Sequence, residues 1–464
     1  MKKIIMVLLF LFGVMINGIL FFAPVENNQN SMTLSIDILA QLEQTYQVFY
    51  STNGEFTESQ SILKPYTNSG EVATLEFELP KETKIIRLDL GEVQDNHVIS
   101  KFALLYDNGT VFDSLEELDS LIVTKTMIAS DNWGKEEVAI TTNGTDSFFI
   151  LDFSSMELED KFQEMEESNR ITTNAKKMIL FDILYIIVVI VFWKYYHQVK
   201  EYFFGLWNNK TVILNLSKND FKIKYAGSYL GIIWAFIQPL VTIGVYWFVF
   251  QVGFRSGNVV EGYPFILWLI SGLIPWFFFV EALSSGTNCL LDYNYLVKKV
   301  VFPISILPII RILATYYVHL FFMFFMFIIF FLYGFAPDLY WLQVIYCEVC
   351  LLVMLLGLVY ATSAMVIFFK DLAQIIVIIV QVGLWLTPIL WDYGAVITHP
   401  TLAFVLKLNP IFYIIQQYRN ALVYQTWFWE DFYWTIYFWI VNILIFGVGV
   451  LLFKKLKIHF ADVI

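Results

Sequence analysis

The chain has 464 residues, of which 58% are hydrophobic, 18% are aromatic and only 15% are charged. A composition this apolar is typical of a protein that lies largely in a membrane, and it excludes one ordinary soluble domain as the whole molecule. The net charge of −12 is unevenly spread, because residues 24–175 contain 28 acidic and 9 basic side chains and the remainder is net basic. The sequence therefore predicts an acidic region in water and a larger region in the bilayer.

Apolar stretches of about 20 residues, the length that a helix needs to cross a bilayer, occur eight times. The first follows Lys2 and Lys3 and could belong to a signal peptide. Its long uncharged run, with no clear small-residue cleavage site, favours a retained anchor. The eight predicted spans are 4–25, 178–193, 225–254, 262–280, 312–337, 349–369, 372–391 and 432–453.

The distribution of lysine and arginine between the short loops predicts that both termini are cytoplasmic. With eight spans, 15 basic residues fall on the inner side, against Arg255, Lys407 and Arg419 in the short outer loops. Lys176 and Lys177, on the outer side of the second span, are exceptions that do not overturn this difference. The expected location is therefore a plasma membrane, with a multi-pass chain.

One apolar segment, residues 393–418, could be mistaken for a ninth span. It contains Lys407 and two prolines, Pro400 and Pro410. A full crossing would also place the basic cluster at 454–457 outside the cell. We therefore expect short helices that enter from the outer face and are covered by other protein.

Between the first two predicted spans, the pattern changes to short runs of β-favouring residues. Turn-rich pieces such as Asp107-Asn108-Gly109 separate these runs. Seven strands at this spacing predict an antiparallel β-sandwich, similar to a jelly roll, within an extracytoplasmic segment at 26–177. The seven runs are 46–51, 72–79, 84–90, 98–106, 121–128, 137–141 and 147–153.

The outer sandwich has two possible roles that the sequence does not separate. It could bind glycan through exposed aromatic residues, or it could be an acidic spacer or docking module. The run 85–91 loosely resembles carbohydrate-binding sandwiches. His97 is the only histidine of the region, so no triad or metal site can be assembled around it. We expect no catalytic or metal-binding residue there.

The predicted elements divide the chain into six segments. After the second span, lysines alternate with Tyr, Phe, Trp and Leu, which is typical of a helix lying in the inner membrane interface. The segments are an N-terminal transmembrane anchor (1–25), the β-sandwich (26–155), a charged connecting helix (156–177), a second transmembrane helix (178–195), a cytoplasmic interfacial amphipathic helix (196–224) and a six-span core (225–464).

Four groups of short stretches follow one another along the six-span core. They are 220–234 with Gln238-Pro239-Leu240, then 296–303 with Leu307-Pro308, then 369–372 with 385–389, and finally Asn409-Pro410 with Tyr418-Arg419. With them, residues 206–464 resemble the polysaccharide-type ABC-2 permeases, which export O-antigen, capsule, wall teichoic acid and rhamnose-rich wall polysaccharides on a lipid carrier. Those families often have Arg after the proline that matches Pro303. Ile304 stands there in this chain, so the role of that Arg cannot be transferred.

The resemblance implies roles for four groups of residues. The loop between the second and third core spans resembles the family's coupling helix, which docks into a groove of the ATPase. Lysines near the inner interface could hold carrier phosphates or merely anionic lipids, and both interpretations remain open. The candidates are Asp292, Tyr293, Asn294, Tyr295, Leu296, Val297 and Lys298 for ATPase coupling, Lys218, Lys222 and Lys224 for lipid phosphates, Trp234, Phe236 and Trp385 for the translocation path, and Tyr418 and Arg419 for an external gate.

The chain contains no G-x-x-x-x-G-K-[ST] phosphate-binding loop. The resemblance therefore implies that ATP and Mg²⁺ bind to a separate ABC ATPase subunit, present in two copies, and that this chain holds no cofactor. A second copy of the chain would complete the transporter. The implied substrate is an undecaprenyl-type lipid-linked polysaccharide, and no nucleic acid is expected as a partner.

Two other functions fit a multi-pass membrane protein. A membrane-embedded glycosyltransferase or ligase needs catalytic groups near the membrane surface, but Glu281 and Asp292 show no partner in the sequence. An ABC-2 permease for small-molecule efflux would share the six spans without needing the polysaccharide-type stretches. An export permease for polysaccharide is therefore the preferred prediction.

Overall fold

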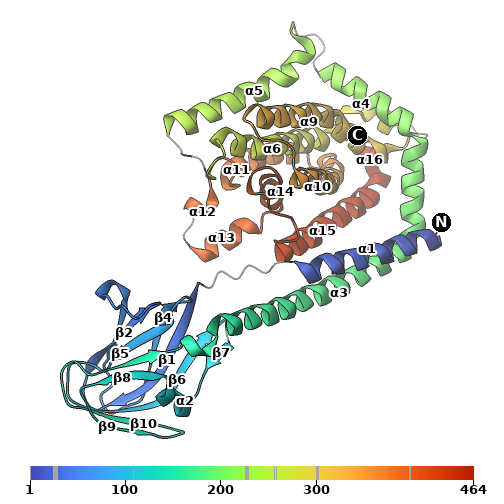
Figure 1. Ribbon diagram of the computed structural model, residues 1–464. Helices are drawn as coiled ribbons and strands as arrows, with labels where there is room; N and C mark the ends of the chain where they lie inside the picture. Colours follow the sequence, from blue (N-terminus) through green and yellow to red (C-terminus); the bar gives the residue numbers. More distant parts are fainter. Residues whose placement is uncertain are drawn as a thin grey trace. The chain divides into compact units, whose positions relative to one another are not determined.

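The chain forms two compact units, Met1–Tyr185 and Ile186–Ile464, in a computed structural model (Figure 1). Arg255, one of the basic residues assigned to the outer loops, lies outside the described residues. The structure describes residues 2–23, 30–107, 109–224, 229–254, 257, 259–298, 302–396 and 399–463.

The first unit contains a β-sandwich. Within the described residues its strands are β1 (Ser31–Ala40), β2 (Gln44–Ser51), β3 (Ser61–Tyr66), β4 (Ala73–Pro80), β5 (Ile85–Asp89), β6 (Asn96–Tyr106), β7 (Gly109–Phe112), β8 (Ile122–Thr126), β9 (Ile128–Trp133), β10 (Val138–Thr142) and β11 (Phe148–Asp152). One antiparallel sheet has the order β4-β1-β6-β10-β9, with β7 paired to β6, and the other has the order β3-β2-β5-β11-β8. Phe77 and Phe102 of the first sheet and Phe149 of the second belong to one buried core.

Alternation of apolar and charged residues explains why these strands form a two-layered structure. In β4, the side chains of Leu75, Phe77 and Leu79 are buried, whereas the intervening Glu76 and Glu78 are exposed. Successive side chains of a strand point to opposite faces, so this pattern places one face of the strand in the core and the other in water.

Each of the seven β-prone runs overlaps a strand, so the predicted β-rich region is confirmed. Strands β1, β3, β7 and β9 were not predicted. β3 carries Pro65, which cannot donate to a ladder, and it lies at the edge of its sheet, where proline is tolerated. β1 pairs with both β4 and β6. Its alternating pattern was hidden because it closely follows an apolar span.

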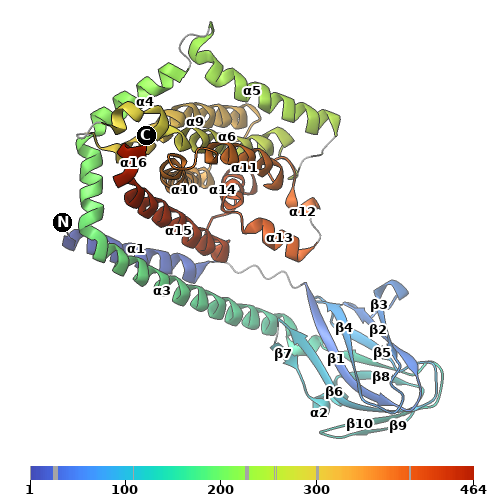
Figure 2. The same ribbon diagram turned by 180° about the vertical axis from the view of Figure 1, so that it is seen from behind.

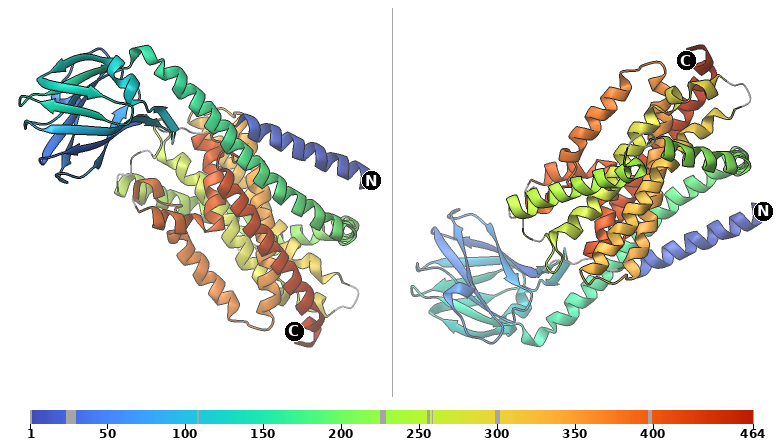
Figure 3. Two further views of the ribbon diagram at one scale, coloured as in Figure 1. Left: turned by 90° about the horizontal axis from the view of Figure 1, so that it is seen from below. Right: turned by 90° about the horizontal axis from the view of Figure 1, so that it is seen from above.

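Helix α3, Leu158–Asn208, is one helix of 51 residues that bends near its C-terminal end (Figure 1, Figure 3). The predicted boundaries after residues 177 and 195 fall inside it, so the predicted connecting helix, the second span and the start of the interfacial helix belong to one continuous helix. The stretch contains no proline and a single glycine, Gly205, so the change from charged to apolar composition does not end the helix. The predicted interfacial helix at 196–224 is instead divided between α3 and α4 (Lys210–Lys224).

Helix α1, Lys2–Phe22, contacts α3 through polar side chains. Asn17 Nδ2 donates to Asp182 Oδ1 at 2.8 Å, and Asn174 Nδ2 donates to the carbonyl of Ala23 at 2.9 Å. Each of the first two predicted spans thus carries a polar side chain that meets one from the other. Polar groups in apolar spans pair in this way because lipid offers them no partner.

The second unit is helical. Apolar helices make up most of it, and short helices join them. Their bounds are η3 Gly231–Ile233, α5 Trp234–Trp247, η4 Phe248–Gly253, α6 Phe265–Thr287, α7 Cys289–Asp292, α8 Asn294–Val297, η5 Ile304–Ile306, α9 Leu307–Leu332, η6 Leu339–Leu342, α10 Gln343–Val366, α11 Leu372–Leu386, α12 Tyr393–Val396, α13 Pro400–Lys407, α14 Pro410–Arg419, η7 Asn420–Tyr424, α15 Phe432–Leu456, η8 Lys457–His459 and α16 Phe460–Val463.

Within the described residues, five helices are long and apolar enough to cross a membrane. Each overlaps one of the predicted core spans, and the remaining core span coincides with the shorter apolar helix α11. The segment 393–418 contains the three short helices α12, α13 and α14. The five long helices are Gly231–Gly253, Phe265–Thr287, Ile304–Leu332, Leu339–Val366 and Phe432–His459.

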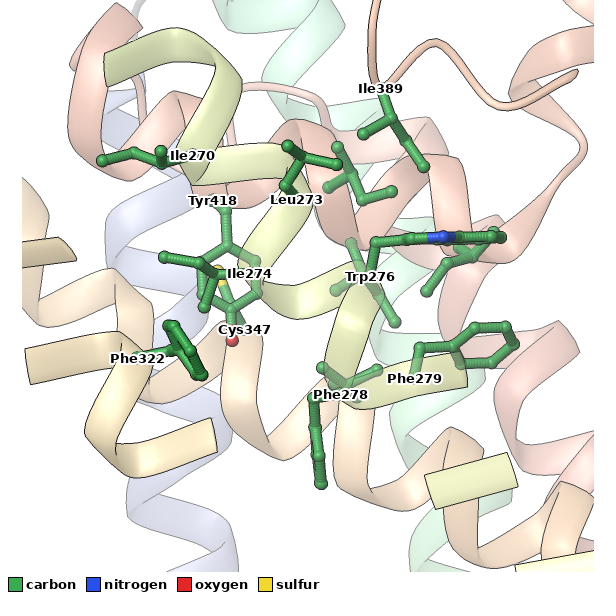
Figure 4. Close-up of a cluster of buried hydrophobic side chains, with 14 of the residues drawn as sticks. Ile270, Leu273, Ile274, Trp276, Phe278, Phe279, Phe322, Cys347, Ile389 and Tyr418 are labelled. Carbon is green, nitrogen blue, oxygen red and sulfur yellow. The ribbon is translucent and has the colours of Figure 1, made fainter. Parts of the chain in front are cut away.

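The core of the second unit surrounds α6, α10 and α14. Figure 2 shows α10 and α14 near the centre of the bundle, with α5 and α15 towards its outside. Ile274, Phe322, Cys347 and Tyr418, from four different helices, meet in one buried cluster (Figure 4). The bundle is therefore held by interlocked aromatic and aliphatic side chains, for which close packing supplies the attraction.

Helices α10 and α15 approach so closely that their backbones touch. A Cβ atom on Gly449 would lie 2.0 Å from the carbonyl oxygen of Gly357, and one on Gly357 would lie 2.6 Å from the Cα of Phe446. Small residues at such crossings allow helices in membranes to pack tightly. By contrast, a Cβ on Gly447 would meet nothing within 4 Å.

We expect Gly449→Val to force α10 and α15 apart, because the clash is with backbone that cannot move aside. The variant should lose about 1–3 kcal/mol of stability, the usual cost of overpacking. Thermal unfolding of the purified protein in detergent measures this. The matched control is Gly447→Val, two residues away. Equal melting temperatures for the two variants would contradict this close approach.

Candidate functional site

A cavity of about 530 Å³ opens in the second unit between α5, α6, α9 and α11, next to the C-terminal end of α4. Its wall combines aromatic, polar and charged side chains. The lining residues are Asp220, Phe221, Lys224, Trp234, Ala235, Gln238, Pro239, Thr242, Ile274, Trp276, Phe277, Phe278, Val280, Glu281, Ser285, Arg311, Ala314, Thr315, Val318, His319, Phe322, Val380, Gln381 and Leu384.

The inner wall of the cavity is rich in aromatic rings. Trp276 and Phe278 come from α6 and Phe322 from α9, and Figure 4 shows these three near one another. Gln238 on α5 and Gln381 on α11 add exposed amide groups. Amide side chains at this position of apolar helices need a polar partner, which lipid does not provide. The wall therefore suits a ligand with both flat apolar faces and hydrogen-bonding groups.

Four charged residues form the rim of the cavity. Lys224 Nζ lies 2.5 Å from Glu281 Oε1, and Arg311 Nε lies 3.5 Å from Asp220 Oδ2. Arg311 also donates to Asp292 Oδ2 at 2.5 Å. Glu281 and Asp292, which had no partner in the sequence, are thus paired with cations. Because the two rim cations are paired with the two rim carboxylates, and Arg311 also with Asp292, this rim is not a ready anion-binding site.

The predicted coupling segment folds as two single-turn helices, α7 and α8. Tyr293, Leu296 and Val297 are buried in a cluster with residues of α4, α9, α10 and α15. The remaining candidates, Asp292, Asn294, Tyr295 and Lys298, are exposed. The segment therefore has an anchored face and an exposed face.

Tyr293 joins this segment to the rim. Its hydroxyl donates a hydrogen bond to Asp220 Oδ1, and the Arg311 guanidinium lies 5.2 Å from the centre of its ring. Burial and the nearby Asp220 carboxylate raise the pKa of Tyr293 above its usual value, so the hydroxyl keeps its proton and remains a donor. Burial also raises the pKa of Asp292, although Arg311 opposes this effect.

The three candidate lysines differ in their surroundings. Lys218 and Lys222 lie one turn apart on α4, and both are exposed. Lys224 is instead engaged by Glu281 at the cavity rim. Only Lys218 and Lys222 therefore present cations to the surface.

The three candidates for the translocation path are not brought together. Trp234 lines the cavity. Phe236 packs on Phe321, with ring centres 4.1 Å apart, and does not line it. Trp385 is 58% exposed and also lies outside the lining. Sequence reasoning missed Trp276 and Phe278, because their position opposite α5 depends on the tertiary fold.

The two candidate gate residues are buried. Arg419 donates to the carbonyls of Pro388 and Ile389 at 2.7 and 2.8 Å, and its guanidinium lies 3.5 Å above the ring of Trp268. Tyr418 lies in the same core, at 0% exposure. Arg419, on α14, thus contacts both the segment that follows α11 and Trp268 of α6. These contacts stabilise the packing of the three helices in the described state.

A buried carboxylate on α10, Glu348, was not singled out in the sequence. It accepts hydrogen bonds from Tyr418 at 2.6 Å, and its Oε1 lies 2.8 Å from His319 Nε2. His319 also lines the cavity, stacked on Phe278. These polar side chains thus satisfy one another's hydrogen-bonding groups, for which lipid offers no partner. The sequence offered one signal, a histidine inside an apolar span.

Replacing Arg419 with Gln should destabilise the second unit, because the carbonyls of Pro388 and Ile389 lose charged donors worth about 1.5–3 kcal/mol each. The expected result is a lower melting temperature in detergent. Lys455→Gln, which removes an exposed cation from the end of α15, serves as the control. A melting temperature for Arg419→Gln equal to that of the control would show that the hydrogen bonds of Arg419 do not stabilise the second unit.

Known proteins resemble the part of the chain that holds the cavity. Residues 211–423 match the family described as ABC-2 type transporter. The O-antigen export system permease protein RfbA of Klebsiella pneumoniae is 27% identical over 257 residues, which is 54% of this chain and 95% of the relative. RfbA of Myxococcus xanthus is 27% identical over 222 residues, or 47% of this chain and 83% of the relative. The cavity therefore lies in the part of the chain that matches the ABC-2 type transporter family and is similar to O-antigen export permeases.

Proposed function

We propose that this chain is the permease subunit of an ABC transporter that exports a lipid-linked cell-envelope polysaccharide across the plasma membrane. The polymer would be of the wall polysaccharide, teichoic acid or O-antigen type. The observation that carries the proposal is an aromatic and amide-lined cavity in a domain whose similarity to O-antigen export permeases covers nearly their whole length.

The chemistry of the cavity suits a sugar chain. The flat ring of Trp234, which is exposed, offers an apolar face on which a sugar ring can stack. The amides of Gln238 and Gln381 can exchange hydrogen bonds with hydroxyl groups of successive sugars. Such contacts repeat along a polymer and do not depend on one sequence of sugars, which is what a transported chain requires.

The lipid carrier would be held near the inner surface by α4. The rim cations Lys224 and Arg311 are already paired with carboxylates. Lys218 and Lys222 are exposed, and no hydrogen bond or ion pair engages them within the described residues. These two lysines are therefore the cations of α4 best placed for the phosphates of an undecaprenyl-type carrier, or for anionic lipid.

The energy would come from a separate ATPase. Two copies of the chain would assemble with two ATPase subunits, which carry the ATP and Mg²⁺. The exposed face formed by Asn294, Tyr295 and Lys298 combines an aromatic anchor with polar neighbours, as expected of a short helix in a groove. The coupling segment and both termini would then lie in the cytoplasm, and residues 26–177 would lie outside.

The outer sandwich would contact the exported glycan. The run 85–91, which loosely resembles carbohydrate-binding sandwiches, does not itself support a site. Arg87 is bound by Asp89 at 2.7 and 2.8 Å and by Asp146 at 2.8 Å, and Phe148 covers its guanidinium. Its donors are thus already engaged. Glycan binding by the sandwich therefore rests on the fold alone, and a spacer role is its alternative.

A membrane glycosyltransferase is less well supported. Among the described residues, no group of three or more His, Cys, Asp and Glu could hold a metal ion. In the sandwich, burial lowers the pKa of His97 to about 4, and His97 Nδ1 lies 2.8 Å from the Tyr46 hydroxyl, so His97 is a neutral core residue. Small-molecule efflux differs from polysaccharide export only in the cargo, which the following experiment identifies.

Depletion of the protein from its own cells should remove the polymer from the cell surface and leave carrier-linked polymer inside, because synthesis continues while export stops. Mass spectrometry of extracted lipid-linked sugars and surface polysaccharide analysis measure both pools. Depletion of an unrelated multi-pass protein is the control. Surface polymer at the normal level would contradict the proposal, and loss of polymer without internal accumulation would favour a glycosyltransferase.

The exposed docking face makes a second prediction. Tyr295→Ala should weaken binding of the ATPase by about tenfold or more, because an aromatic anchor in a groove carries much of the binding energy. Pull-down of the ATPase with the tagged permease measures this. Tyr333→Ala is the matched control, because Tyr333 is exposed to a similar degree, 51% against 54%, at the far end of α9. Equal recovery of ATPase by both variants would contradict docking at α8.

A further inference from the structure

A cluster of hydrogen bonds and ion pairs joins α4 to the coupling segment and to α9. Asp220 on α4 accepts the hydroxyl hydrogen of Tyr293 and pairs with Arg311 on α9. Arg311 in turn donates to Asp292 at the end of α7. The cluster therefore contacts three elements at once. Both Asp220 and Arg311 also line the cavity.

The Asp220 carboxylate is only 8% exposed, so its charge needs compensation from the protein. Tyr293 and Arg311 supply it, one through a hydrogen bond and the other through an ion pair. Removing either would leave a buried charge without its partner, which is far more costly than breaking an exposed pair. The α7–α8 segment thus cannot move away from α4 without a large penalty.

The next turn of α4 on the same face is held more weakly. Lys224, one turn after Asp220, pairs with Glu281 on α6 across the rim. The side chains of this pair are 44% and 46% exposed, so water can replace each partner at little cost. If α7–α8 moves away from α6, the Lys224–Glu281 pair breaks before the contacts of Asp220 do. Helix α4 would then follow α7–α8.

Helix α5 follows α4 closely in the sequence and forms one wall of the cavity. Six residues separate Lys224 from Gly231, where the α5 segment begins. Of the five long apolar helices, Gly231–Gly253 is the least enclosed, with 11% of its apolar window buried, against 22–78% for the others. Packing in the bundle therefore constrains α5 little, and a movement of α4 can reposition Trp234 and Gln238.

We propose that Tyr293, Asp220 and Arg311 are positioning residues that couple the ATPase-docking segment to the cavity wall. Movement of α7–α8 is passed to α4 through the buried cluster, separates Lys224 from Glu281, and carries α5 with it. This inference rests on the proposed function, because it requires an ATPase bound at α7–α8. It assigns a positioning role to side chains of three different elements, α4, α9 and the α7–α8 segment.

The test uses the full permease reconstituted with its ATPase, together with cells that carry the same variants. Tyr293→Phe removes the hydroxyl and keeps the buried ring, and Asp220→Asn removes the charge and keeps the shape. Both should retain the ATPase and its hydrolysis of ATP. Polymer exported per ATP hydrolysed should fall about fivefold or more, the lower end of typical coupling between sites.

Tyr333→Phe is the matched control, because it makes the same chemical change on an exposed tyrosine whose hydroxyl makes no hydrogen bond among the described residues. Its export per ATP should equal that of the unaltered protein. Melting temperature and recovered ATPase show that each variant is folded and assembled. If one variant does not fold, the other still decides the question.

Two results would overturn the inference. One is normal export per ATP in a folded Tyr293→Phe or Asp220→Asn complex. The other is a loss of export that only matches a loss of ATP hydrolysis, which would indicate a damaged assembly and not a broken linkage. Failure of the proposed function is distinct, because the unaltered permease would then bind no ATPase or would export no polymer.

Discussion

The arrangement of α4, α9 and the α7–α8 segment depends on one buried carboxylate. Asp220 lies at the end of α4 with little access to water, and its charge is tolerated only because Tyr293 and Arg311 come from two other elements to meet it. The same contacts anchor the otherwise short coupling helices α7 and α8. Because α4 leads into α5, this one compensated charge relates the proposed docking surface to the cavity that the polymer would enter. The contacts of Asp220 are harder to break than the exposed pair of Lys224 and Glu281. Helix α4 would therefore move with α7–α8 and away from α6.

The need of buried polar and charged side chains for a partner also determines how other helices of the bundle pack. Arg419 satisfies the carbonyls of Pro388 and Ile389, and Glu348 is met by His319 and Tyr418. None of these groups could remain in an apolar environment alone, so each fixes the relative position of the helices that carry its partners. Interlocked aromatic side chains and the contact of α10 with α15 at glycine complete the packing. The first unit follows the same rule on a smaller scale, where Asn17 meets Asp182 between α1 and α3.

Sequence patterns predicted the elements better than the contacts between them. Apolar runs located the core helices, because the bilayer fixes their length and composition, and alternation located most strands. The pattern failed where composition changed without a break in the helix, as in α3, and where an edge strand contained Pro65. The predicted coupling segment, expected as one short helix, forms the two single-turn helices α7 and α8. The pairing of Asp292 with Arg311 joins residues on two elements and has no local signature. For the same reason Tyr418 and Arg419, assigned to a gate by resemblance, are seen to hold the core, and Glu348 was overlooked.

The most direct test is a pair of experimental structures of the permease bound to its ATPase, one without nucleotide and one with ATP held unhydrolysed. The account predicts that the Tyr293 hydroxyl stays within about 3.5 Å of the Asp220 carboxylate in both states, the limit for a hydrogen bond. It also predicts that Lys224 separates from Glu281 in one of them as α5 moves. An Asp220–Tyr293 contact that breaks while the Lys224–Glu281 pair remains would contradict it.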